Sequence, residues 1–192
     1  MTGPAPVEEH RGLPVLQLDD ALAWDAWLTE HGQVQDGCWL LHAKKGSGLV
    51  TVTYDDAVDV ALCHGWIDGL LNRRDERAYL IRYTPRRRRS AWSQVNRERV
   101  ERLVAAGRML PTGLAEVERA RADGRWERAY APASRIEVPD DLRTALAAAG
   151  RDAAWSALPA QDRYAVLHRL HAAKRPETRV RQIAALVARL GG

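Results

Sequence analysis

The hydrophobic pattern of the chain changes its period at Pro85. Before that residue, the apolar runs 66–71 and 78–83 are short, and the charged segment 72–77 separates them, as in a hairpin of two strands. Pro85 ends the second run, because proline cannot donate to a strand ladder. Beyond it, apolar residues recur at helical spacing. We therefore predict an α+β fold: a small N-terminal α/β part with a short mixed or antiparallel sheet, followed by a helical C-terminal part.

Two domains follow from this division. Residues 10–130 are predicted to form an α+β N-terminal domain, and residues 138–192 a helical C-terminal domain. The segment 131–138 contains Pro132 and has no periodicity, so we interpret it as a linker. The chain has 192 residues, of which 46% are hydrophobic, which is typical of a globular protein with a sizeable core.

Residues with capping side chains indicate where the helices begin. Thr53 can cap a helix that starts at the next residue, because its hydroxyl can accept a hydrogen bond from the first turn. Ser90 is predicted to cap a helix beginning near Ala91, and Thr112 a shorter helix. Pro176 suits the first position of the last helix, where its missing N–H is not needed.

The net charge of +4 is unevenly spread along the chain. Residues 82–102 contain eight arginines against two glutamates, and residues 159–192 contain seven basic against two acidic side chains. Two such regions would attract anions if they shared a face. The N-terminus does not resemble a secretory signal, and no apolar run approaches the ~20 residues of a membrane span. We expect a cytoplasmic protein without membrane insertion.

The segment 66–96 contains the candidate site. Asp68 lies inside an apolar strand, where a carboxylate could act as a catalytic acid or base or could contact a ligand. Arg86 and Arg88 offer forked donors for a carboxylate or a phosphate. The predicted ligand-binding residues of an anion-friendly Trp/Asp/Arg pocket, including a second basic segment, are Lys44, Trp66, Arg86, Arg88, Trp92, Asn96, Lys174, Arg175 and Arg179.

These residues also have structural interpretations. Asp68 could pair with Arg82 or Arg86 to hold the strands, and the arginines could form a solvated linker. The segment 174–179 could be a tight turn between helices. The segment 44–48 is better interpreted as a turn than as a phosphate-binding loop, because it lacks the required glycine and lysine spacing.

The sequence predicts neither a metal site nor a cofactor. His168 and His171 lie one helical turn apart, but no further metal ligand is close in sequence. Cys63 precedes His64, yet a catalytic triad depends on geometry that the order of residues does not give. We interpret Cys38 and Cys63 as buried structural thiols.

Taken together, the motifs resemble the YdeI/OmpD-associated, bacteriocin-protection family, from about Leu13 to Leu190. The segments that carry the resemblance are 39–48, 52–55, 61–69, 83–86, 90–96 and 173–183. The resemblance implies a bacterial protein, and its name points to tolerance of antimicrobial peptides or envelope stress. It provides no catalytic residues to transfer. His64 and Arg88 depart from the family's pattern and make the surroundings of the site more polar.

We expect a ligand- or peptide-binding protein that contributes to bacteriocin, antimicrobial-peptide or envelope-stress tolerance, with a small anionic ligand or peptide as its partner. One alternative is an enzyme that acts on a small anionic substrate with Asp68 as acid or base. A second alternative is a protein that binds the nucleic-acid backbone, for which steep salt dependence would be diagnostic. No helix-turn-helix signature favours that second alternative. The sequence leaves the oligomeric state open.

Overall fold

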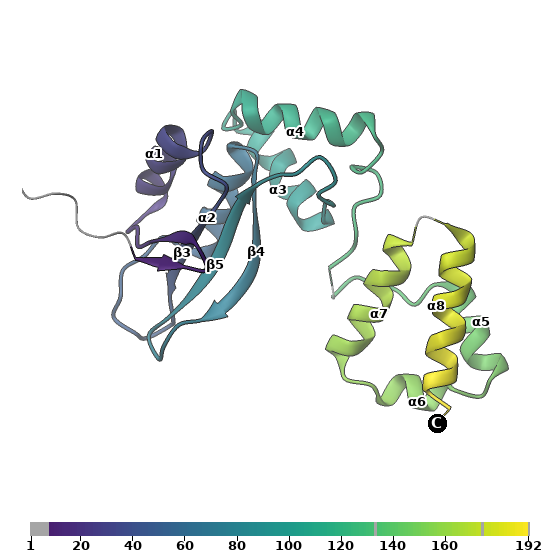
Figure 1. Ribbon diagram of the computed structural model, residues 1–192. Helices are drawn as coiled ribbons and strands as arrows, with labels where there is room; N and C mark the ends of the chain where they lie inside the picture. The colour runs from purple at the N-terminus through teal and green to yellow at the C-terminus, as the bar shows by residue number, and fades with distance from the viewer. Residues whose placement is uncertain (1–7, 133, 174, 192) are drawn as a thin grey trace, which may run out of the picture. The chain divides into compact units, whose positions relative to one another are not determined.

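The computed structural model describes residues 8–132, 134–173 and 175–191, which form two compact units (Figure 1). The first unit contains residues 8–90 and 96–127, and the second contains residues 91–95 and the described residues from Arg128 onward. A mixed sheet lies in the first unit, and helices make up most of the second. The predicted α+β fold is confirmed.

The sheet has five strands among the described residues, in the order β1-β2-β3-β5-β4. Strands β2 and β3 are parallel, and the other neighbours are antiparallel. The predicted hairpin is confirmed as β4–β5, and its register shifts between Asp68 and Leu71. The strands are β1 (Glu9–His10), β2 (Leu13–Leu16), β3 (Cys38–Ala43), β4 (Trp66–Arg73) and β5 (Ala78–Pro85).

The predicted helix cap at Thr53 is confirmed in the first unit. Thr53 precedes α2, and its hydroxyl oxygen accepts a hydrogen bond from the Asp56 N–H at 3.1 Å. Asp20 has the same role at α1, where its carboxylate accepts from the Ala23 N–H at 2.8 Å. The helices with residues in this unit are α1 (Ala21–His31), α2 (Tyr54–Cys63), α3 (Gln94–Ala105) and α4 (Pro111–Ala122).

Two predicted helix starts are wrong. Helix α3 begins at Gln94 rather than near Ala91, and the Ser90 hydroxyl instead accepts a hydrogen bond from the Arg87 N–H. The cause is a short pairing with residue Tyr130, whose N–H donates to the Trp92 carbonyl and whose carbonyl accepts from the Gln94 N–H. That pairing holds the chain extended. Helix α4 begins at Pro111, so Thr112 lies inside its first turn.

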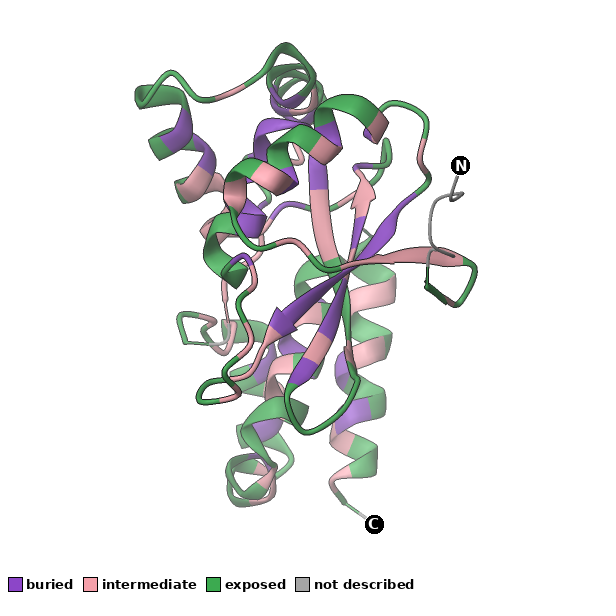
Figure 2. Cartoon of the chain, turned by 90° about the vertical axis from the view of Figure 1, so that its left-hand side faces the viewer, coloured by how far each residue is buried: buried purple, intermediate pink, exposed green. Residues whose placement is uncertain are grey.

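Aromatic side chains form the core between the sheet and helices α1 and α2. Trp24 makes edge contacts with Trp66 of β4 and Tyr83 of β5, and its Nε1–H donates to the Ala57 carbonyl of α2 at 3.1 Å. These side chains are fully buried. Figure 2 shows the same concentration of buried residues along the strands. The opposite face of the sheet packs a second cluster: Trp39, Leu41, Ala78 and Leu80.

Glycines let α2 end directly against the start of α4. Gly65 has a φ of +79°, which is accessible to glycine without strain, and turns the chain after α2. Gly113 lies so close to α2 that a Cβ there would be 2.4 Å from the Cys63 carbonyl oxygen. The same oxygen accepts a hydrogen bond from the Leu110 N–H. The two helices are therefore in backbone contact.

The second unit is built from helices around one apolar cluster. Pro176 is at the start of α8, as predicted. Helix α5 packs against α6 and α8, and α7 packs against α8. The helices are α5 (Asp140–Ala148), α6 (Asp152–Ala157), α7 (Ala160–Ala172) and α8 (Pro176–Arg189), and their shared core is Leu142, Leu146, Trp155, Val166, Leu167, Leu170, Ile183 and Leu186. No helix in the described ranges is long and apolar enough to cross a membrane.

Candidate functional site

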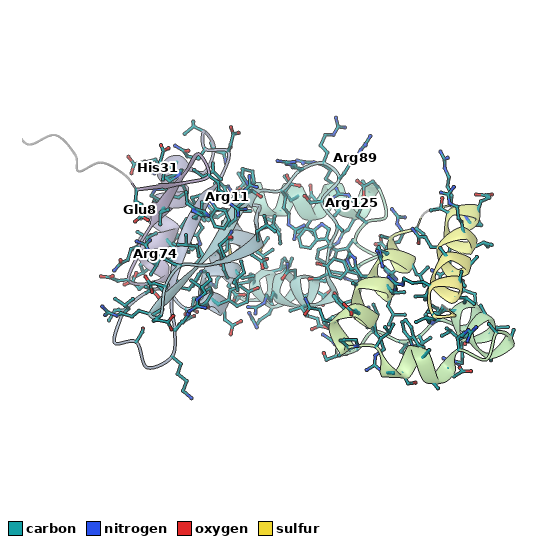
Figure 3. All side chains as sticks on the ribbon, turned by 60° about the horizontal axis from the view of Figure 1, so that its bottom comes forward. Glu8, Arg11, His31, Arg74, Arg89 and Arg125 are labelled. Atoms are coloured by element: carbon teal, nitrogen blue, oxygen red, sulfur yellow. The ribbon has the colours of Figure 1, made fainter. Side chains whose placement is uncertain are left out.

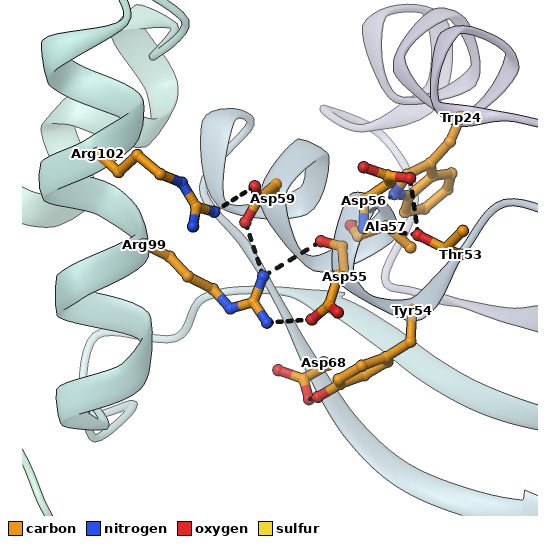
Figure 4. Close-up of polar contacts among 10 residues, drawn as sticks. All are labelled: Trp24, Thr53, Tyr54, Asp55, Asp56, Ala57, Asp59, Asp68, Arg99 and Arg102. Carbon is orange, nitrogen blue, oxygen red and sulfur yellow. Dashed lines mark hydrogen bonds and ion pairs between the residues drawn. The ribbon is translucent and has the colours of Figure 1, made fainter.

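Asp68 lies on β4 beside the first turn of α2. Its Oδ2 accepts a hydrogen bond from the hydroxyl of Tyr54 at 2.7 Å (Figure 4). Asp68 is paired in register with Tyr83, whose side chain packs toward α1, so both side chains belong to the face of the sheet that α1 and α2 cover. The register shift that follows Asp68 ends the regular ladder at this point. Asp68 is half-buried, and Tyr54 is 40% exposed.

Two arginines of α3 are held by carboxylates of α2 next to this pair. Arg99 Nη1 lies 2.9 Å from Asp59 Oδ1, and Arg102 Nη2 lies 2.6 Å from Asp59 Oδ2. Arg99 also pairs with Asp55 (Figure 4). Asp59 is buried, and both of its oxygens are satisfied, which offsets the cost of removing its charge from water. The arginines thus tie α3 to α2, and each has at least one guanidinium nitrogen engaged by a carboxylate.

The electrostatics keep Tyr54 protonated and leave Asp68 as an acceptor. Burial raises the pKa of Tyr54, and the charge of Asp68 and the hydrogen bond to it raise that pKa further. Burial, followed by the charge of Asp68, likewise raises the pKa of Tyr83. One oxygen of Asp68 accepts the hydrogen bond from the Tyr54 hydroxyl, and the carboxylate retains lone pairs that can accept a hydrogen bond from a ligand.

Two buried polar atoms belong to the aromatic layer beneath Tyr54. The ring of His42 lies 6.2 Å from the rings of both Tyr54 and Tyr83. Its Nδ1–H donates to the Val52 carbonyl at 3.2 Å, while its Nε2 has no hydrogen-bond partner among the described residues. The hydroxyl of Tyr83 is also unpartnered in that part of the chain. Burial lowers the pKa of His42, so its ring is neutral.

One further carboxylate and one exposed apolar side chain lie near the pair. Asp55 is exposed in the first turn of α2, whereas the Asp56 carboxylate accepts a hydrogen bond from the Thr53 hydroxyl on another face of the helix. Leu71, three residues beyond Asp68 on β4, is 63% exposed. We call the set Tyr54, Asp55, Asp68 and Leu71 the Tyr54–Asp68 surface. It offers hydrogen-bond acceptors, negative charge and apolar area, so its chemistry suits a ligand with cationic and apolar groups.

Lys44 does not lie at this surface. Its Nζ donates to the Asp75 carbonyl at 2.7 Å, in the loop that joins β4 to β5. In the sheet register, Asp68 is opposite Tyr83, whereas the Lys44 N–H pairs with the Arg77 carbonyl at the other end of β5. At about 3.3 Å per residue, the two sites are about 20 Å apart. Lys44 therefore stabilises the hairpin turn.

Trp66 and Arg86 lie inside the first unit. Trp66 is 1% exposed, and its Nε1–H donates to the Gly32 carbonyl at 3.1 Å. Arg86 is 5% exposed, and its backbone N–H donates to the Gly65 carbonyl. Arg88 is exposed, as is Arg89, in the segment that follows β5 (Figure 3). Neither Trp66 nor Arg86 presents its side chain at the surface.

The remaining predicted site residues are divided between the units. Asn96 is half-buried near the start of α3 in the first unit. Trp92 is buried in the second unit. There, Arg179 pairs with Asp141, with Nη2 2.9 Å from Oδ1, and its Nη1 donates to a carbonyl of α7. Arg175 is exposed just before α8. Lys174 lies outside the described residues.

Cysteine and histidine form a different arrangement at the end of α2. Burial raises the pKa of Cys63, and burial also raises that of Cys38, which disfavours the reactive thiolate in both. His64 Nε2 lies 2.8 Å from Asp25 Oδ1 on α1, so it links two helices. In the second unit, His168 packs against two tyrosine rings. No group of three His, Cys, Asp or Glu side chains suited to a metal ion occurs among the described residues.

The residues that hold Asp68 and α3 in place were missed by sequence analysis. From the sequence, Tyr54 is predicted only as the first residue of a helix, and no role is predicted for Asp59 or Arg99. A signal for them exists, because Asp55 and Asp59 are spaced i,i+4 and therefore share one face of α2. Arg99 and Arg102 have the i,i+3 spacing that places both on one face of α3.

Comparison with family models divides the chain in two. Residues 16–116 match the family described as a domain of unknown function, DUF8412. This match covers more than half of the 192 residues. The chain belongs to the DUF8412 family. The Tyr54–Asp68 surface and the arginines of α3 all lie within the DUF8412 match.

Residues 135–191 match a second family model, described as "Bacteriocin-protection, YdeI or OmpD-Associated". The resemblance to that family is thereby confirmed for the C-terminal part. The motifs between residues 39 and 96 lie instead within the DUF8412 match. No curated protein and no solved structure matched the chain.

Proposed function

We propose that the protein binds peptides with cationic and apolar groups at the Tyr54–Asp68 surface and in this way contributes to tolerance of bacteriocins, antimicrobial peptides or envelope stress. The observation that carries the proposal is the half-buried Asp68 carboxylate, which Tyr54 fixes by a 2.7 Å hydrogen bond beside exposed Asp55 and exposed Leu71. The match of residues 135–191 to a bacteriocin-protection family supports the biological role.

The charges favour a cationic ligand over the anionic one that the sequence suggests. Four carboxylates, those of Asp55, Asp56, Asp59 and Asp68, lie on α2 and β4. The arginines of α3 that face them are engaged in ion pairs with two of these carboxylates. An ammonium or guanidinium group of a peptide would meet the lone pairs of Asp68 that Tyr54 leaves open, whereas an added anion would meet like charge.

The direct test is binding of a labelled amphipathic peptide of lysine and leucine, followed by fluorescence anisotropy at low and physiological salt. We expect binding that weakens with salt, because part of this surface is exposed to screening ions. Asp68→Asn should weaken binding ~10-fold, since it removes a charge-assisted hydrogen bond. Tyr54→Phe should weaken it less, because the carboxylate remains while its orientation is lost.

Glu76→Gln is the matched control, because Glu76 is an exposed carboxylate in the turn at the far end of the β4–β5 hairpin. It should leave peptide affinity unchanged. Equal affinity in wild type and Asp68→Asn, or an equal loss in Glu76→Gln, would contradict the proposal. Duplex DNA in place of the peptide tests the nucleic-acid alternative, with Arg88→Ala as its variant.

The Tyr54–Asp68 pair also favours an enzymatic alternative. A carboxylate in hydrogen-bond contact with a protonated phenol can take up a proton from a substrate while the phenol holds its orientation. Thermal-shift screening of small anionic and neutral compounds tests this alternative. A stabilising compound whose turnover is lost in Asp68→Asn, without loss of binding, would support catalysis over peptide binding.

A further inference from the structure

A second hollow lies in the other unit, between α7 and α8. Its volume is about 290 Å³, at the small end of the range for ligand sites. Its apolar wall comes from both helices, and three long polar side chains complete it. The residues around it are Val166, Arg169 and Leu170 of α7, and Gln182, Ala185, Leu186 and Arg189 of α8.

Neither arginine of this hollow forms an ion pair with another residue in the part of the chain that the structure describes. Arg169 and Arg189 lie in the last turns of α7 and α8, and no carboxylate of the described residues lies within ion-pair distance of either. Arg179, on the same helix as Arg189, is by contrast engaged by Asp141. Each free guanidinium retains a planar fork of donors, which suits a carboxylate or phosphate. The hollow is thus cationic over an apolar wall.

Gln182 supplies the third polar group. Its Oε1 is buried and has no hydrogen-bond donor among the described residues. A buried acceptor without a donor is destabilising, and a ligand that brings a hydroxyl or amino group would relieve that cost. Gln182 and Arg189 are seven residues apart on α8 and therefore lie on one stripe of the helix. A ligand could contact both while lying on Ala185 and Leu186.

We propose that the hollow between α7 and α8 binds a small amphiphilic anion: a carboxylate or phosphate attached to a short apolar body. Arg169 lies near the connection between the two helices and Arg189 at the far end of α8, so the arginine at whichever end receives the anionic group would hold it. Gln182 would accept a hydrogen bond from the ligand, and the apolar wall would cover its body. This site is separate from the Tyr54–Asp68 surface and lies within residues 135–191, so either proposal can fail without the other.

Calorimetric titration of the full chain with phenyl phosphate, benzoate and octanoate tests the site. Inorganic phosphate, which lacks an apolar body, should bind at least several-fold more weakly than phenyl phosphate, since it buries no ring. Benzyltrimethylammonium, of opposite charge, should not bind. At least one of Arg169→Gln and Arg189→Gln should weaken phenyl phosphate ~10-fold through loss of a charge-assisted contact, and unchanged binding in both would overturn the proposal. Absence of binding by all three organic anions would overturn the proposal.

Arg181→Gln is the matched control, because Arg181 is exposed on the same helix and does not border the hollow. It should bind phenyl phosphate as the wild type does. If Arg181→Gln lost as much affinity for phenyl phosphate as Arg189→Gln, general positive charge would explain the effect, and a specific binding site would be refuted. Gln182→Leu tests the site if an arginine variant is unstable. Its affinity for 4-aminobenzoate, which carries an amino group on an apolar ring, should fall, and an unchanged value would count against the proposal.

The same titration can distinguish a lipid head group from a free organic anion as the ligand. Vesicles of phosphatidylglycerol that displace phenyl phosphate would support the site and assign it to a lipid head group. Vesicles that leave phenyl phosphate bound would support it with a free organic anion as ligand. Chemical-shift changes confined to α7 and α8 are expected with either source. Changes that map only outside these helices would refute it.

Discussion

Replacement of Gly113 by alanine gives the sharpest test of how α2 and α4 pack. A Cβ at this position would lie 2.4 Å from the Cys63 carbonyl oxygen and 2.7 Å from the Leu62 carbonyl oxygen. Cβ atoms are essentially never found closer than 3.0 Å to such atoms, so the backbones of two helices must separate by roughly 0.6 Å. No flexible side chain can move aside to absorb this contact.

Two opposing effects decide the sign of the change. Alanine is favoured over glycine inside a helix by ~1 kcal/mol. Overpacking of a close contact costs ~1–3 kcal/mol, and a clash with two carbonyl groups belongs at the upper end. We therefore expect Gly113→Ala to lower the free energy of unfolding by ~2 kcal/mol, which corresponds to a Tm about 4–8 °C lower for a chain of this size.

Urea unfolding followed by tryptophan fluorescence is the appropriate assay, since five of the seven tryptophans lie in the first unit. Ala115→Gly on the exposed side of α4 measures the helix-propensity effect alone and should cost ~1 kcal/mol. If Gly113→Ala were as stable as wild type, or more stable, the close backbone contact of α2 and α4 would be refuted.

Three further predictions concern charged and titratable groups. Asp59→Asn should lower the free energy of unfolding in urea by about 3 kcal/mol, because it leaves the two partner arginines without their buried carboxylate. The matched Glu76→Gln variant should show no comparable loss in the same assay. The ion pair with Arg179 lowers the pKa of Asp141 below 3.8. The pair is partly exposed and stabilises the fold by ~1 kcal/mol or less; this contribution is complete above pH 3.8 and is lost as the pH falls through the lowered pKa. Thermal melts from pH 6 to about pH 2 should show this loss in wild type and not in Asp141→Asn. Burial lowers the pKa of His42 below 6.5, so as the pH falls the unfolded chain binds a proton before the folded chain does, and stability should fall below pH 6.5. His42→Gln should flatten this pH dependence of stability. An equally steep dependence in the variant would exclude His42 as its source.

The candidate site could be predicted only in part from the sequence. Asp68 stood out because a carboxylate inside an apolar strand is unusual, and the structure places it at a half-buried position with a defined partner. Trp66 and Arg86 were grouped with it because they are close in sequence. Whether a strand residue is buried, however, depends on which face of the sheet is covered by helices. Trp66 is on the face that α1 covers and is fully buried.

Local chemistry by itself determined the elements of this protein. The turn at residues 72–77, the cap at Thr53, the helix start at Pro176 and the change of period at Pro85 all act within a few residues, so the sequence predicts them directly. The tertiary structure decided everything that needed contacts between distant segments. The pairing with Tyr130 delays the start of α3 to Gln94.

The same distinction explains the site. Carboxylates of α2 pair with Arg99 and Arg102 of α3, which are 40 or more residues away in sequence, and these pairs are the reason why we propose a cationic rather than an anionic ligand. Charge counted along a chain cannot show which groups pair, because ion pairs form between side chains that only packing brings within a few ångströms. The sequence specified which charges are present, and the packing of α3 on α2 decided which of them remain available to a ligand.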